Sequence, residues 1–224
     1  MRWSSQSGAE LWLQLDRRGN LIGVHPHFAG TSAVDVRVEG IVHRDDQTAL
    51  DGALDAWVNG QSTGGGDYPF VVDCANYHQF ADQAPPSWAR VHVAAFAHEL
   101  DVFRSIEHFD ESQKDSEVRF ASQSFVPAGS FNDAGPPEAE AFFCGHVVAT
   151  ETRVNDLSRR AFQWMQVDTY AATFDVVADP ELIREMPSAG SVIKGTFWLS
   201  ARIESSVSRA GWLKRMMWRI RNVA

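Results

Sequence analysis

Alternation of apolar and polar side chains defines the first element that the sequence predicts. Over residues 10–16 (ELWLQLD) the odd-numbered positions are all leucine, and the even-numbered ones are polar or Trp. A period of two is typical of a half-buried strand. Turn residues at 18–20 and the apolar run at 21–24 favour a returning partner strand.

Further strands and one helix are expected before residue 126. Residues 33–42 alternate again, and residues 68–75 read as a short buried strand. Apolar positions within 46–58 fall at helical spacing, and Asn-Gly follows, so this segment is expected to be a helix. Residues 89–103 fit either a helix or a strand, and the neighbouring strands favour a strand.

The order of elements after residue 138 resembles an OB-fold. Residues 126–138 have the composition of a loop or linker. Strands are then expected at 139–153, twice within 161–178, and at 192–203, with a short helix at about 179–186. The resemblance implies a small Greek-key barrel. It covers roughly residues 139–203 and lacks the fifth strand, so either the N-terminal half closes the barrel or the barrel is of another kind.

The sequence therefore predicts a mainly β fold, that is, a β-dominated α+β protein with antiparallel sheets. We expect a β-rich N-terminal half (1–126), an OB-like half (139–204) and a basic amphipathic tail (205–224) that forms a short helix. The sequence shows no internal repeat.

Charge is distributed unevenly along the chain. Net charge is −9, but residues 207–224 contain five basic residues and no acid, which leaves 15 basic and 29 acidic residues elsewhere, a net charge of −14. An acidic body argues against nucleic-acid binding, because phosphate contacts depend on Lys and Arg. The apolar runs are too short to span a bilayer, and the start of the chain is not typical of a secretory signal. Both cysteines lie in apolar segments and are expected to be buried thiols, so we expect a cytoplasmic protein.

Two tryptophans interrupt the polar faces of predicted strands. Trp12 and Trp198 each lie among polar neighbours at alternating positions. Because so large an aromatic surface is rarely left in water, each is expected to be covered by another element or to bind a ligand or partner.

The tail combines an apolar stripe with basic residues. Such a helix can dock on protein, by self-association or on a partner, or less favourably on an anionic membrane surface. The candidate binding residues of the tail are Trp212, Leu213, Met216, Met217, Trp218 and Ile220.

Histidines provide the strongest argument for an enzyme. His25 and His27 place two imidazoles on one side of an extended segment, and His98 and Glu99 add two potential ligands. The spacing matches no established metal motif, so no metal and no cofactor are expected. The sequence favours a non-catalytic binding or protein-interaction protein, with a metal-dependent hydrolase or an acidic inhibitor of the immunity-protein type as alternatives.

Overall fold

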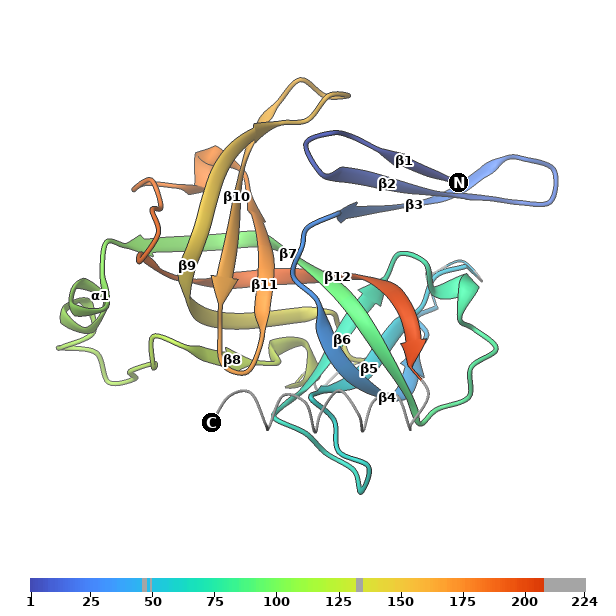
Figure 1. Ribbon diagram of the computed structural model, residues 1–224, viewed down its shortest axis with the longest axis horizontal. Coiled ribbons are helices and arrows are strands. Elements are labelled where there is room, and N and C mark those ends of the chain that lie inside the picture. The colour runs from blue at the N-terminus through green and yellow to red at the C-terminus, as the bar shows by residue number, and fades with distance from the viewer. Residues whose placement is uncertain (46–47, 49, 132–134, 208–224) are drawn as a thin grey trace.

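The structure is a computed structural model that describes residues 1–45, 48, 50–131 and 135–207. It is mainly β, as the sequence predicts. A three-stranded antiparallel sheet, here called the N-terminal sheet, contains β1 (Arg2–Ser4), β2 (Ala9–Leu15) and β3 (Leu21–Phe28) and lies against the rest of the molecule (Figure 1).

A second, mixed sheet of nine strands forms the body of the protein. The strands are β4 (Val34–Val42), β5 (Ala53–Val58), β6 (Pro69–Cys74), β7 (Ser87–Phe103), β8 (Ser124–Val126), β9 (Glu140–Val154), β10 (Ala161–Asp168), β11 (Thr173–Ala178) and β12 (Val192–Val207). The helical elements are α1 (Ile106–Ser112) and the 3-10 turns η1 (Tyr77–Gln79), η2 (Ala128–Phe131) and η3 (Pro180–Leu182).

Eight of the nine strands pair into two closed circuits of five that share the long ribbon β7–β12, and β8 pairs with the edge of β9. In the first circuit, β4, β5 and β6 pair in series, β6 runs parallel to β12, and β7 closes onto β4. In the second, β9, β10 and β11 pair in series, β11 runs parallel to β7, and β12 closes onto β9. Each circuit thus takes one strand from the other half of the chain.

The two circuits have the same pattern of strand pairing. The segment β4–β5–β6–η1–β7 corresponds to β9–β10–β11–η3–β12 in order, direction and partners. The two corresponding segments meet at the pair Ser200↔Ala94 in the β7–β12 ribbon. In the two parallel pairings, Ser200 also pairs with Asp73 of β6, and Ala94 pairs with Asp175 of β11. The fold therefore contains a structural repeat that the sequence analysis missed.

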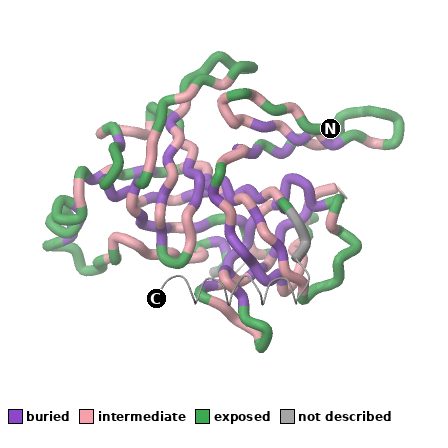
Figure 2. The backbone as a smooth tube through the Cα atoms, viewed as in Figure 1, coloured by how far each residue is buried: buried purple, intermediate pink, exposed green. Residues whose placement is uncertain are grey.

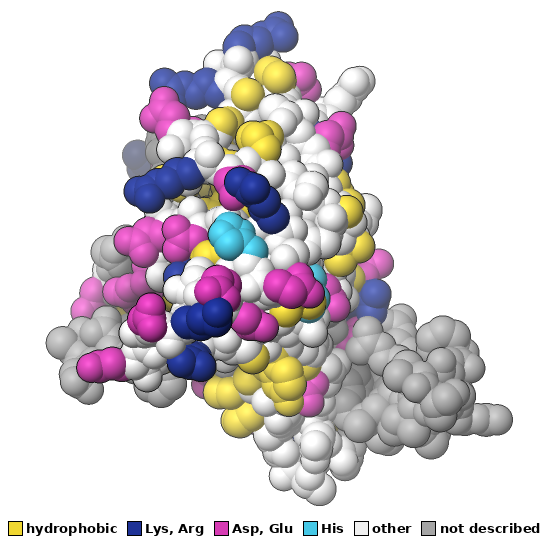
Figure 3. All heavy atoms as spheres, turned by 90° about the vertical axis from the view of Figure 1, so that its left-hand side faces the viewer, with side chains coloured by type: hydrophobic (Ala, Val, Ile, Leu, Met, Phe, Trp, Pro, Cys, Tyr) yellow, Lys and Arg dark blue, Asp and Glu magenta, His cyan; other side chains and the backbone are white. Residues whose placement is uncertain are grey.

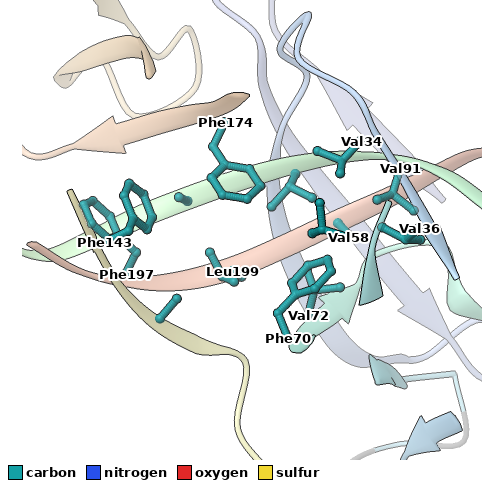
Figure 4. Packing of buried hydrophobic residues seen from close by; sticks show 14 of the residues in the cluster. Val34, Val36, Val58, Phe70, Val72, Val91, Phe143, Phe174, Phe197 and Leu199 are labelled. Carbon is teal, nitrogen blue, oxygen red and sulfur yellow. The ribbon is translucent and has the colours of Figure 1, made fainter. Parts of the chain in front are cut away.

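One continuous hydrophobic core fills both circuits. Phenylalanines occupy the second circuit, where the rings of Phe143 and Phe197 stack at 3.9 Å between centroids. Valines such as Val36 and Val58 fill the first, and Leu199 lies between the two groups (Figure 4). Exposed backbone is concentrated in the outer hairpins and loops (Figure 2).

The helix expected over 46–58 is wrong for its C-terminal part. Residues 53–58 form β5, and Leu54, Ala56 and Val58 alternate into the core while pairing with β4 and β6. Sheet pairing on both sides outweighs the weak helical spacing. Gly52, just before the strand, lies so close to the ring of Tyr77 that an added Cβ would be 2.6 Å from it.

Most of the other predicted strands are confirmed. The strand predicted at 89–103 is confirmed as β7, and the strands predicted at 33–42, 68–75, 139–153, 161–178 and 192–203 are confirmed with small shifts of their ends. The helix expected at 179–186 shortens to η3, capped by the Asp179 side chain as predicted. Helix α1, capped by Ser105, was not predicted.

The tail lies almost entirely outside the described residues. Strand β12 continues to Val207, three residues into the predicted tail. The predicted helix and its binding residues, Trp212 to Ile220, lie beyond residue 207.

Candidate functional site

The N-terminal sheet covers the body with its polar face, not its leucine face. The half-buried strand at residues 10–16 is confirmed as β2, but Glu10, Trp12 and Gln14 are its buried residues. Leu15 is exposed, as are Leu21 and Val24 on the paired strand β3. We call the outward surface formed by Leu11, Leu13, Leu15, Leu21 and Val24 the leucine face.

Hydrogen-bond partners explain why the polar face is buried. The Gln14 amide donates to Asp51, and the Trp12 indole N–H donates to Glu10 at 3.0 Å. Further along the sheet, the hydroxyl of Ser5 donates to Asp156 in the β9–β10 hairpin. The bonds of Gln14 and Trp12 satisfy groups that burial would otherwise leave without partners, whereas the bond between Ser5 and Asp156 is exposed.

Three side chains bridge the N-terminal sheet to the midpoint of the β7–β12 ribbon. The Ser200 hydroxyl lies 2.9 Å from His25 Nε2 and 2.9 Å from His27 Nδ1, and 3.2 Å from the carbonyl of Pro26. Ser200 is 0% exposed and His27 is 2% exposed. We call this group the histidine–serine bridge.

Burial makes both bridge histidines poor bases. It lowers the pKa of His25, although the charges of Asp73 and Asp51 oppose the effect. The pKa of His27 lies well below its ordinary value of 6.5, because of burial and then the nearby charges of His25, Arg202 and His92. Both imidazoles are therefore neutral at neutral pH.

Trp198 is half-buried in the same layer between the two sheets. Its ring packs between those of His25 (5.4 Å) and Phe96 (5.2 Å). Its indole N–H donates to Asp73 at 2.7 Å, and Arg44 forms an ion pair with the other oxygen of that carboxylate. Trp12 is 9% exposed and lies below the guanidinium of Arg2. Each predicted tryptophan is thus covered by the opposing sheet or its own.

An apolar groove of about 420 Å³ opens beside the bridge, between the N-terminal sheet, the β9–β10 hairpin and the body. Its walls include Phe28, Phe96 and Phe162, and His27 also lines it. Nε2 of His27 is buried and has no hydrogen-bond partner among the described residues. Polar side chains such as Glu10 and Arg160 complete the lining, so the groove is mainly, but not wholly, apolar.

A second pocket, of about 650 Å³, lies under the other end of β2. It is more polar and is lined by Trp12, Gln14, Asn76 and Arg202, among others. We call it the Arg202 pocket.

The four candidate metal ligands do not converge as a set, although His25 and His27 meet at the bridge. His98 is exposed and lies 3.9 Å from Glu140, away from the bridge, and Glu99 is also exposed. Within the part of the chain that the structure describes, no three His, Cys, Asp or Glu side chains form a group that could hold a metal ion.

Sequence reasoning found His25, His27, Trp12 and Trp198 but missed their partners. Ser200 and Asp73 belong to strands far from β3 in sequence, and both look like ordinary polar positions of alternating strands. Only the parallel pairing of β6 and β12 brings them together.

Among the described residues no helix is long and apolar enough to cross a membrane. Comparisons with protein-family models, with curated proteins and with solved structures give no match, so the site is interpreted from its geometry alone.

Proposed function

We propose that this chain is a non-catalytic binding protein that holds a small, mainly apolar molecule in the groove beside the histidine–serine bridge. The observation that carries the proposal is an apolar groove whose lining includes His27, a residue whose Nε2 is buried and has no hydrogen-bond partner among the described residues. A neutral imidazole nitrogen needs a hydrogen-bond partner once buried. An alcohol hydroxyl provides one whichever tautomer His27 adopts.

The size and lining of the groove support a small-molecule ligand. Binding pockets typically enclose 300–1,000 Å³, with apolar walls and a few polar groups that fix orientation. Phe96 and Phe162 offer aromatic surface, and Leu157 at the hairpin tip is exposed above them. An elongated aliphatic alcohol fits this chemistry.

The reactive side chains favour binding over catalysis. Ser200 contacts two imidazoles but is fully buried, so no substrate reaches its hydroxyl without opening of the sheets. Burial raises the pKa of the Cys74 thiol to about 12 and also raises that of Cys144, so both remain protonated and weakly nucleophilic.

The second circuit supports an OB-like interpretation as part of this proposal. Strands β9, β10, β11 and β12 with η3 follow the expected order, and β7 takes the place of the missing fifth strand. Acidic side chains surround isolated basic ones on one face (Figure 3), so we propose no nucleic-acid ligand for this barrel.

A series of primary alcohols tests the proposal. Each buried methylene contributes roughly 0.8 kcal/mol, so two additional carbons should tighten binding about tenfold until the groove is full. Calorimetry with hexanol, octanol and decanol measures this slope. Ala161→Phe fills the groove from an exposed position and should abolish binding, whereas Ala121→Phe, at an exposed position outside the groove lining, should not. Absence of binding by all three alcohols would refute the proposal.

A second candidate function is self-association through the leucine face. Leu21 and Val24 are 58% and 49% exposed on a sheet whose other side is buried. A flat apolar face is self-complementary about a two-fold axis. Light scattering of wild type and a Leu13→Ser/Val24→Ser variant tests it, and equal masses at all concentrations would exclude it. Contact of the tail with protein remains a separate prediction.

A further inference from the structure

Arg202 is a half-buried cation without an anionic partner. It lies on the outer face of β12, two residues beyond Ser200, where the N-terminal sheet covers the ribbon. Its Nε is buried without a hydrogen bond, and its guanidinium forms no ion pair with any described residue. Such a group is rare in a chain with 29 acidic residues.

The acidic residue in the pocket lining already has partners. Glu204, two residues further along β12, lies 3.3 Å from Arg90 and 3.5 Å from His92. Burial of the Nε of Arg202 without a partner is costly, since this nitrogen loses its hydration and nothing replaces it. The arrangement is stabilised if an anion supplies the missing contacts.

A second nitrogen without a partner lies beside Arg202. His92 pairs with Arg202 across β7 and β12, and its Nδ1 is buried with no hydrogen-bond partner among the described residues. The charge of Arg202 also contributes to the low pKa of His27. An anion beside Arg202 would balance that charge.

The pocket in front of Arg202 is large enough for an organic molecule. Its volume is about 650 Å³, and Arg2, Gln14 and Gln79 are among its other lining residues. Guanidinium binds planar oxyanions through two parallel hydrogen bonds. Trp12 adds an aromatic wall.

We propose that the Arg202 pocket binds a small polar molecule through a carboxylate or phosphate group, with Arg202 as the anchoring residue. This site is separate from the apolar groove and does not depend on the function proposed for it.

Calorimetric titration at constant ionic strength tests the proposal. The probes are benzoate, inorganic phosphate and the neutral analogue benzamide. Arg202→Gln removes the anchor, and Arg184→Gln removes an equal charge at an exposed position outside the pocket. We expect benzoate or phosphate, but not benzamide, to bind, and Arg202→Gln to weaken that binding at least tenfold while Arg184→Gln leaves it unchanged.

Protection from phenylglyoxal keeps the test valid if Arg202→Gln does not fold. In the wild-type protein the bound anion should slow modification of Arg202, read by peptide mass spectrometry, and should leave Arg184 unaffected. The proposal is overturned if neither anion binds, if benzamide binds equally well, or if both variants weaken binding to the same extent. Unchanged modification of Arg202 at saturating anion also overturns it.

Discussion

Substitution of Ser200 by Ala removes the centre of the histidine–serine bridge. The hydroxyl lies within 2.9 Å of one nitrogen of His25 and one of His27, and 3.2 Å from the Pro26 carbonyl. Alanine leaves all three atoms without this partner. Because Ser200 is 0% exposed, water cannot take its place unless the sheets separate.

The expected loss of stability follows from these contacts. An orphaned buried polar atom costs about 1–3 kcal/mol, and at least the two imidazole nitrogens are affected, so we expect a loss of about 2–6 kcal/mol. A typical domain has a free energy of unfolding of about 5–15 kcal/mol, so a variant of average stability should still fold.

Urea unfolding measures the change, with the slope of free energy against urea expected to stay constant. Ser122→Ala is the matched control, because Ser122 bonds His146 Nε2 at the same 2.9 Å but is only partly buried. It should lose about 0.5–1 kcal/mol. Equal losses in the two variants, or a loss below about 1 kcal/mol for Ser200→Ala, would refute the role assigned to the bridge.

Three further predictions concern the stability of the whole chain. The bridge histidines have pKa values below the ordinary 6.5, so the unfolded chain binds protons before the folded protein does as the pH falls. The free energy of unfolding should therefore decrease from about pH 6.5 downward, by up to about 1.4 kcal/mol per pH unit for each histidine. Unfolding at several pH values checks this, and a flat profile between pH 7 and 5 would contradict it. Gly52→Ala should destabilise by about 1–3 kcal/mol, because its Cβ would meet Tyr77, whereas Gly40→Ala, with 4.0 Å of clearance, should change little; equal melting temperatures would contradict this. Deletion of residues 208–224 should lower the melting temperature or change the oligomeric state if the tail docks on protein, and loss of liposome binding alone would indicate a membrane anchor.

The sequence predicts most strands of this fold because their alternation is local. It fails where tertiary pairing decides: residues 53–58 become a strand between β4 and β6, and β7 closes a circuit begun by residues after 139. The structural repeat cannot be seen in the sequence because it lies in the order in which the strands pair, not in repeated residues.

In the site, too, residues with a local sequence signal could be predicted, and residues placed by tertiary pairing could not. His25 and His27 could be singled out from their spacing, and Trp12 and Trp198 from their polar neighbours. The partner of the histidines, Ser200, has no local signal. Periodicity did not give the orientation of β2, because alternation identifies two faces but does not state which one finds hydrogen-bond partners.

We propose that the groove beside the bridge, between the two sheets, binds a small apolar molecule, and nuclear Overhauser contacts between octanol and the labelled protein would show such binding. We expect contacts from the octanol chain to the rings of Phe96 and Phe162, with the hydroxyl end near His27. Contacts confined to Leu13 and Val24 on the leucine face, or no contacts at a saturating concentration, would contradict it.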